Sequence, residues 1–203
     1  MLSRAMFGSI FYCSLLLVAG VTEPPRAQEI ATFPPPSEQN GINAQVKGNI
    51  EQIKQEDLLT TIESWLSSQF TLPMIDRHPR IELASPSTIA SLGYKKLLSD
   101  PSIIAGSETD SQLRTVSLYD DLIQTIYLPK GWTGSTDVEV SMLVHEMVHH
   151  FQNLLGLKYA CAQEREQLAY MAQDRWLSQS GHSLASDFDL DPFSLLVATT
   201  CKY

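Results

Sequence analysis

Apolar residues recur at helical spacing in four stretches of the chain. Three of these stretches are residues 49–70, 86–98 and 135–155, where an apolar side chain returns every three or four positions. That period places the apolar side chains on one face of a helix. The fourth stretch covers about residues 161–178 and is closed by Gly181, a residue suited to end a helix. The pattern therefore predicts four helices.

Shorter stretches alternate in the manner of β-strands. Residues 80–84 form one candidate strand, and residues 112–119 and 122–128 form two more. Residues 120–121 separate the last two at the position of a tight turn, so we expect a hairpin there. The strand around residues 125–128 is expected to bind an extended substrate by strand addition. Helices together with a small sheet indicate a single-domain α+β fold.

The N-terminal part of the chain differs in character from the rest. Residues 1–21 resemble a signal peptide, because Arg4 is followed by an apolar run and then by small residues. The alternative is an uncleaved N-terminal anchor. Residues 22–48 are rich in proline, glutamine, glutamate and asparagine, so we expect a disordered or extended linker. The domain proper then covers residues 49–203.

The overall charge restricts the partners that we expect. The chain carries a formal net charge of -9 over 203 residues. This argues against nucleic-acid binding, which favours basic patches. A signal peptide predicts an extracytoplasmic protein, periplasmic or secreted, without stable membrane association once the signal is removed. The alternative is a protein anchored in the membrane by its N-terminal apolar segment, and the oligomeric state is left open.

The cysteines fit an oxidising compartment. Cys13 lies in the predicted signal peptide and would be lost with it, which leaves Cys161 and Cys201. An even pair in an oxidising compartment favours a disulfide between Cys161 and Cys201. The alternative is two buried free thiols.

The helix predicted over residues 135–155 has recognisable ends. Thr136, followed three residues later by Glu139, fits a capping box, and Gly156 fits the C-terminal stop. Its apolar residues cover one broad face, which is the core side, and two histidines lie off that face. We therefore expect a buried apolar arc and a separate polar arc on this helix.

The polar arc carries an H-E-x-x-H motif at residues 145–149. Residues four apart lie one turn above each other on a helix, so His145 and His149 can bind one metal ion. Glu146 lies about 100° round the helix from His145, beside the metal, where a base for a metal-activated water is needed. The motif thus predicts two metal ligands and a catalytic Glu146.

A catalytic zinc site needs a third protein ligand. Glu164 and Glu166 follow on the next predicted helix, two positions apart, so they point to nearly opposite sides. Glu166 shares its side with small and apolar residues suited to helix packing, whereas Glu164 shares its side with Arg175, where a surface ion pair accounts for it. A carboxylate on a packing face needs a partner such as a metal ion. We therefore choose Glu166, and one Zn²⁺ is the expected cofactor.

These motifs resemble those of the gluzincin group of zinc metallopeptidases. An H-E-x-x-H helix followed by a helix with a ligand Glu is typical of that group, and residues 166–170 resemble its E-x-x-A-[DY] element. The chain looks most like a small secreted bacterial family of uncharacterised proteins of this type. The resemblance covers about residues 112–177 and implies a small zincin fold.

Tyr170 departs from the gluzincin pattern. Many gluzincins have an Asp at this position that orients a ligand His, and the hydroxyl of Tyr170 could accept the imidazole N–H instead. The resemblance also implies an oxyanion stabiliser, for which His182 and Tyr170 are the nearby candidates. His150 adjoins the motif and is expected beside the ligands rather than on the metal. His78, next to Pro79, is interpreted as a surface loop histidine.

The leading functional hypothesis is a zinc-dependent metallopeptidase with a peptide or protein substrate. Glu146 would act as its general base. A second hypothesis is a metal-binding or assembly module with little or no proteolysis, suggested by the small size of the chain and the lack of a recognisable substrate domain. A third is a purely structural helix without a metal.

Overall fold

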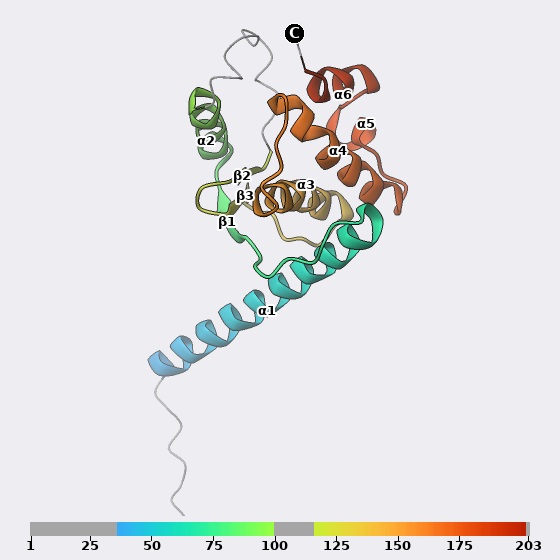
Figure 1. The fold of residues 1–203 in the computed structure, drawn as a ribbon. Coiled ribbons are helices and arrows are strands. Elements are labelled where there is room, and N and C mark those ends of the chain that lie inside the picture. Colours follow the sequence, from blue (N-terminus) through green and yellow to red (C-terminus); the bar gives the residue numbers. More distant parts are fainter. Residues whose placement is uncertain (1–35, 100–115, 202–203) are drawn as a thin grey trace, which may run out of the picture. The chain divides into compact units, whose positions relative to one another are not determined.

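The structure of the protein is a computed structural model, which describes residues 36–99 and 116–201 (Figure 1). The chain divides into two compact units, residues 1–43 and 44–203. Of the first unit only the start of a helix is described, so the predicted signal peptide lies outside the described residues. The sheet and the hydrophobic core belong to the second unit. Among the described helices, none is long and apolar enough to cross a membrane.

Helices make up most of the described chain. The helices predicted at residues 86–98, 135–155 and 161–178 are all present, with ends that agree to within two residues. Two short helices follow them near the C-terminus. The described helices are α1 (Pro36–Phe70), α2 (Pro86–Ser99), α3 (Asp137–Leu154), α4 (Ala162–Ser178), α5 (Leu184–Phe188) and α6 (Pro192–Thr199).

Helix α1 corrects the predicted linker. The helix begins at Pro36, so the expectation of an extended or disordered chain is wrong for residues 36–48. Proline fits the first turn of a helix, where its missing N–H is not needed. The residues that follow include Glu, Gln, Ala and Lys, which favour a helix although they leave no apolar stripe to reveal it.

Three short strands form one mixed sheet in the order β1-β3-β2. Strand β1 (Arg80–Ala84) runs parallel to β3 (Thr125–Pro129), and β2 (Leu118–Asp120) runs antiparallel to it. A hairpin is therefore present here, but its first strand is Leu118–Asp120 and its turn covers residues 121–124. The sequence predicts the first strand over residues 112–119, of which 112–115 lie outside the described residues. The turn lies later than expected because the Asp120 carboxylate, at the end of β2, accepts the N–H groups of the two following turn residues, Leu122 and Ile123.

The position of β3 rules out the predicted strand addition. β3 is the central strand and hydrogen-bonds to β1 on one side and to β2 on the other. Neither edge of residues 125–128 is free to pair with a substrate, so that expectation is wrong. Sequence alternation identifies a strand but does not say whether it lies in the centre or at the edge of a sheet.

Helix α3 is the central element of the second unit. It lies between the sheet and α4 (Figure 1), and α1 contributes Leu59, Ile62 and Leu66 to the same core. Every residue of α3 from Val140 to Gln152 is buried. The predicted division into a buried apolar arc and a separate polar arc is wrong in one respect, because α4 covers the polar arc as well. The two histidines of the motif consequently lie inside the protein.

A disulfide fixes the C-terminal helix to the start of α4. Cys161 is the N-cap of α4, where its sulfur accepts the N–H of Glu164, and Cys201 follows α6. The structure joins Cys161 to Cys201, which is the pairing that the cysteine count favoured. The link holds α6 against α4.

His78 connects α1 to the segment that leads into β1. Its Nε2 atom lies 2.9 Å from Oε2 of Glu63, its Nδ1 atom contacts Oε1 of Glu56, and its side chain is 13% exposed. The interpretation as a surface loop histidine is therefore wrong, because two glutamates about two helical turns apart on α1 contact its ring. Carboxylate oxygens only accept hydrogen bonds, so this geometry requires both ring nitrogens to be protonated. Burial lowers the pKa of His78, but the hydrogen bonds to Glu63 and Glu56 raise it overall.

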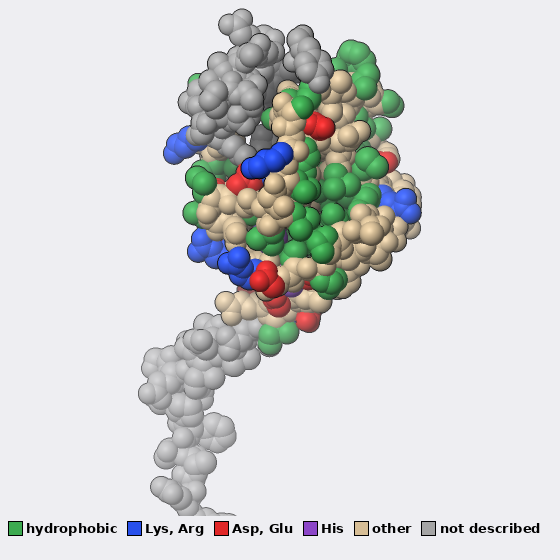
Figure 2. Space-filling model, viewed as in Figure 1, with side chains coloured by type: hydrophobic (Ala, Val, Ile, Leu, Met, Phe, Trp, Pro, Cys, Tyr) green, Lys and Arg blue, Asp and Glu red, His purple; other side chains and the backbone are tan. Residues whose placement is uncertain are grey.

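Apolar side chains occupy much of the visible surface, and Lys and Arg side chains stand at separate positions among them (Figure 2). The most exposed of the large apolar side chains include Leu122 in the hairpin turn and Phe193 in α6. Apolar residues scattered in this way are normal on a folded domain, so we assign them no role.

Candidate metal centre

Both ends of α3 are defined by its own sequence. The Thr136 hydroxyl accepts the N–H of Glu139 at 3.1 Å, as in the predicted capping box. The Glu139 carboxylate instead accepts the N–H groups of Ser135 and Thr133, so the box is only half formed. Burial raises the pKa of Glu139, but hydrogen bonds from the Thr133 hydroxyl and from the N–H groups of Ser135 and Thr133 lower it overall. At the other end Gly156 has a φ of 61°, the left-handed conformation that ends a helix.

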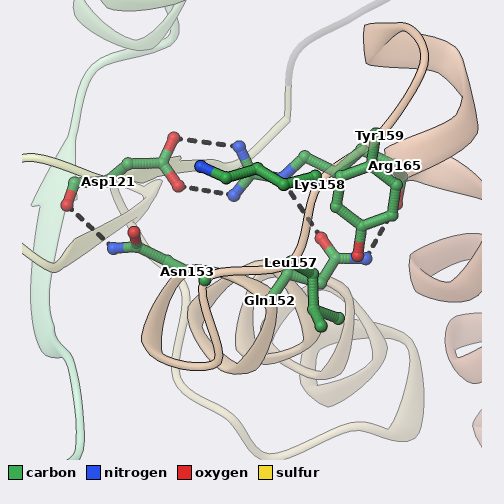
Figure 3. Close-up of a pocket in the computed structure, with 8 residues that line it drawn as sticks. Asp121, Gln152, Asn153, Leu157, Lys158, Tyr159 and Arg165 are labelled. Carbon is green, nitrogen blue, oxygen red and sulfur yellow. Dashed lines mark hydrogen bonds and ion pairs between the residues drawn. The ribbon is translucent and has the colours of Figure 1, made fainter.

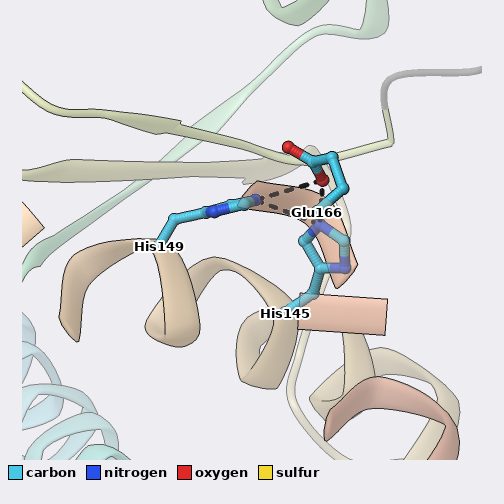
Figure 4. Close-up of side chains that lie close together, drawn as sticks. All are labelled: His145, His149 and Glu166. Atoms are coloured by element: carbon cyan, nitrogen blue, oxygen red, sulfur yellow. Dashed lines mark hydrogen bonds and ion pairs between the residues drawn. The ribbon is translucent and has the colours of Figure 1, made fainter. Parts of the chain in front are cut away.

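The structure brings His145, His149 and Glu166 together (Figure 4). Nε2 of His145 lies 3.2 Å from Nε2 of His149 and 3.2 Å from Oε2 of Glu166, and the third side of the triangle measures 3.3 Å. The histidines come from α3 and the glutamate from the first half of α4. The three residues chosen as ligands from the sequence thus point their atoms at one another.

The proton on His145 is located by its neighbours. Ser141 uses its hydroxyl hydrogen on the Val138 carbonyl, so its oxygen accepts from the amide nitrogen of Gln173. The amide oxygen of Gln173 then faces Nδ1 of His145 at 3.0 Å. An amide oxygen only accepts, so Nδ1 of His145 carries the hydrogen. In the neutral ring, Nε2 therefore presents a lone pair.

The same argument holds for His149 through Gln152. The Gln152 amide nitrogen donates to the main-chain carbonyl of Arg165, and its oxygen accepts from Nε of the same arginine (Figure 3). That oxygen also lies 2.9 Å from Nδ1 of His149, which must donate to it. Arg165 is itself held by both carboxylate oxygens of Asp121, beside a pocket of about 220 Å³.

Three acceptor atoms consequently converge on one point. With both Nδ1 atoms protonated, the two Nε2 lone pairs and a carboxylate oxygen face one another at 3.2–3.3 Å. Atoms of this kind repel unless a cation, either a proton or a metal ion, lies between them. Tetrahedral zinc with ligand distances of about 2.1 Å separates neighbouring ligand atoms by about 3.4 Å. The spacing and the donor set of these three residues therefore fit a zinc ion.

Electrostatics in the triangle favour a cation at this point, either a proton or a metal ion. Burial raises the pKa of Glu166, but His149 and His145 hold that pKa well below its usual range. Burial lowers the pKa of His145, whereas Glu166 and then Glu146 raise it overall. The carboxylate is thus ionised, and its charge favours a cation at the two imidazoles.

Glu146 lies beside the triangle and is not part of it. It is 4% exposed, and its Oε1 atom accepts a hydrogen bond of 2.7 Å from the hydroxyl of Ser117. Among the described residues, no hydrogen bond reaches its Oε2 atom. A buried carboxylate with one oxygen held and the other free is suited to accept a proton.

Tyr170 does not orient either histidine. Its ring packs edge-on against His145 with the ring centroids 4.7 Å apart. The imidazole N–H that Tyr170 was expected to accept goes to Gln173 instead, so that expectation is wrong. Within the described part of the chain, the Tyr170 hydroxyl makes no hydrogen bond. Burial, followed by the charges of Glu166 and Glu146, raises the pKa of Tyr170 and keeps its hydroxyl neutral.

His150 faces away from the triangle. Its Nδ1 accepts the hydroxyl hydrogen of Tyr119 at 2.9 Å, and its Nε2 donates to the Arg77 carbonyl at 2.8 Å. The expectation that His150 supports the metal ligands is therefore wrong, because a step of one residue turns the side chain about 100° round the helix. Burial lowers the pKa of His150. It joins α3 to β2 and to the segment before β1.

The two remaining candidates from the sequence, His182 and Glu164, make contacts of other kinds. His182 lies beyond the end of α4 and contacts Asp187, with no contact to the triangle, so it is a poor candidate for an oxyanion stabiliser. Glu164 is exposed, and its carboxylate accepts the N–H of Ala160 at the start of α4. The choice of Glu166 over Glu164 agrees with this geometry.

Sequence reasoning missed the roles of three residues, Gln152, Gln173 and Ser117. Gln152 follows His149 by three positions, and Gln173 follows Glu166 by seven, so helical spacing could have identified both as neighbours of the ligands. Ser117 lies 29 residues before Glu146, just ahead of β2, and nothing in the sequence marks it.

The family comparison covers this whole site. The family model described as "Domain of unknown function (DUF6647)" matches residues 51–203. The chain belongs to this family. The DUF6647 match includes the sheet, α3 and α4, and therefore all the residues of the triangle. No curated protein and no solved structure matches the chain. The family description names no activity, so a function has to come from the geometry of the site.

Proposed function

We propose that this DUF6647 protein is a zinc-dependent hydrolase that cleaves peptide bonds at a gluzincin-like site in a small zincin-like fold. The convergence of His145, His149 and Glu166 carries the proposal, since each presents a bare acceptor atom to the same point. Two imidazoles and one carboxylate with an open fourth position form the ligand set of catalytic zinc.

Residues of this chain would carry the proton transfers. Zinc, when bound, supplies a Lewis acid that polarises a carbonyl and lowers the pKa of water towards about 7. Glu146 takes a proton from the attacking water on its free Oε2 and passes it to the leaving amine. Gln173 and Gln152 keep the two imidazoles in the tautomer that leaves Nε2 available.

Tyr170 is our candidate for the oxyanion stabiliser. Its hydroxyl is neutral because its pKa is raised, and it makes no hydrogen bond within the described part of the chain. A neutral phenol beside the site can donate to the developing negative charge on the substrate oxygen. The resemblance to gluzincins favours a peptide or protein as the substrate.

The compartment belongs to the same proposal. We propose that the domain works outside the cytoplasm, periplasmic or secreted, after removal of an N-terminal signal. The disulfide between Cys161 and Cys201 supports this placement, because such bonds persist in oxidising compartments.

Substitution of the general base tests the mechanism. With zinc-loaded protein and a peptide library, Glu146→Gln should lower the cleavage rate by about 10²–10⁴-fold, because the amide cannot accept the proton. Zinc content should stay unchanged, since Glu146 is not a ligand. Glu164→Gln, an exposed glutamate on α4, is the matched control and should cleave like the wild type.

The outcome of this experiment also separates the other hypotheses. Robust cleavage by the Glu146→Gln protein would contradict the mechanism. Stoichiometric zinc without turnover of any peptide would favour a metal-binding or assembly module. Wild-type protein that binds no zinc would favour the third hypothesis, in which α3 is a structural helix without a metal.

A further inference from the structure

Alternate residues of β2 and the residues flanking it face α3. The Ser117 hydroxyl donates to Glu146, the Tyr119 hydroxyl donates to His150, and the Asp121 carbonyl accepts from Asn153. Side chains two apart on a strand share a face, and helix residues three or four apart form one stripe. The register between β2 and α3 is therefore fixed along this line of contacts.

Two further contacts hold the far end of this line. The Asn153 amide donates to the Tyr119 hydroxyl at 2.9 Å, and Arg165 of α4 binds the carboxylate of Asp121. Tyr119 is fully buried, so its bond to Asn153 forms where water cannot replace it, whereas the pair of Arg165 and Asp121 is partly exposed. Ser117, at the near end, is thereby placed against Glu146.

The contact with Ser117 gives the two carboxylate oxygens of Glu146 different surroundings. Ser117 occupies Oε1 at 2.7 Å, which fixes the rotation of the carboxylate and leaves Oε2 for the proton in transfer. A carboxylate that is only 4% exposed loses most of its hydration, and this costs free energy unless a hydrogen-bond donor replaces the water. The Ser117 hydroxyl is such a donor.

We propose that Ser117 is a positioning residue for the general base. It acts through Glu146, by holding Oε1 so that Oε2 faces the reacting proton. The inference rests on the proposed function for its kinetic consequence, but the contact itself can be measured without turnover.

The kinetic test compares Ser117→Ala and Ser117→Thr in the zinc-loaded protein. Ser117→Ala should lower kcat by about tenfold, while KM and the zinc dissociation constant stay within about twofold, because a misplaced base slows only the chemical step. Ser117→Thr keeps a hydroxyl and should restore most of kcat. Ser178→Ala is the matched control, since that exposed hydroxyl donates to the Arg175 carbonyl on α4, away from Glu146.

A spectroscopic test needs no activity. The carboxyl ¹³C resonance of Glu146, assigned by its loss in Glu146→Gln, should move in zinc-loaded Ser117→Ala and stay in place in Ser178→Ala. An unchanged Glu146 resonance, or a kcat within about twofold of the wild type, would overturn the proposal. If the wild type cleaves no peptide, the proposed function fails, and the resonance alone then decides the role of Ser117.

Discussion

At the scale of single residues, the orientation of two amide side chains decides what the site can bind. Gln173 is fixed by Ser141, and Gln152 is fixed by Arg165, so each turns its oxygen toward an imidazole. In many metal sites a carboxylate accepts the N–H of the ligand imidazole, and it makes the other ring nitrogen a stronger ligand for the metal. A neutral amide fixes the same tautomer without adding negative charge.

Removal of one of these amides should weaken the metal site. Gln173→Leu leaves Nδ1 of His145 without its acceptor, so zinc affinity should fall by about 10–100-fold. Competition with a chromogenic chelator measures the dissociation constant. Gln167→Leu on the exposed side of α4 is the control and should bind zinc like the wild type. Equal zinc affinity in the Gln173→Leu protein would show that the amide does not support the ligand.

Sequence reasoning succeeds for these residues where a helix imposes the geometry. His145 and His149 lie one turn apart on α3, and packing direction separated Glu166 from Glu164 on α4. It fails where contact depends on another element. Ser117 reaches Glu146 from the position just before β2, and the helical or strand period of a single segment does not predict that contact.

At the scale of elements, packing overrides several local patterns. Alternation predicts a strand over residues 122–128 and β3 covers Thr125–Pro129, but only the pairing with β1 and β2 shows that it is the central strand. The same holds for α1, whose polar first half gives no apolar stripe. Its second half is held to the segment before β1 by His78, which contacts two of its glutamates.

The contact of His78 with α1 should make stability depend on pH. Because the folded pKa of His78 is raised above its usual value, the contribution is fully present below about pH 6.5 and is lost as the pH rises through the folded pKa. The groups that contact the ring are the two α1 carboxylates of Glu56 and Glu63, and both raise the pKa of His78. His78→Gln should therefore lower the melting temperature more at about pH 6 than at about pH 9.

Two comparisons complete the experiment on His78. Glu56→Gln should remove part of the same pH dependence, since it removes one of the two carboxylates. If the melting temperatures of the wild type and of His78→Gln differ by the same amount from about pH 6 to about pH 9, the ionised contact is contradicted.

At the scale of the whole molecule, the described elements converge on the space between α3 and α4. The segment just before β2 supplies Ser117, α3 supplies the histidines and Glu146, and α4 supplies Glu166 and Gln173. The disulfide and α6 hold α4 from outside. The DUF6647 family match covers all of these parts, so the whole candidate site lies within the matched domain.

The zinc content of the purified protein tests the central claim most directly. Wild-type protein should hold one zinc per chain, and Glu164→Ala should hold the same amount. Glu166→Ala should lose most of its zinc while keeping a cooperative melting transition, because only the third ligand is removed. A wild type without zinc, or a Glu166→Ala protein that retains it fully, would contradict the three-ligand site.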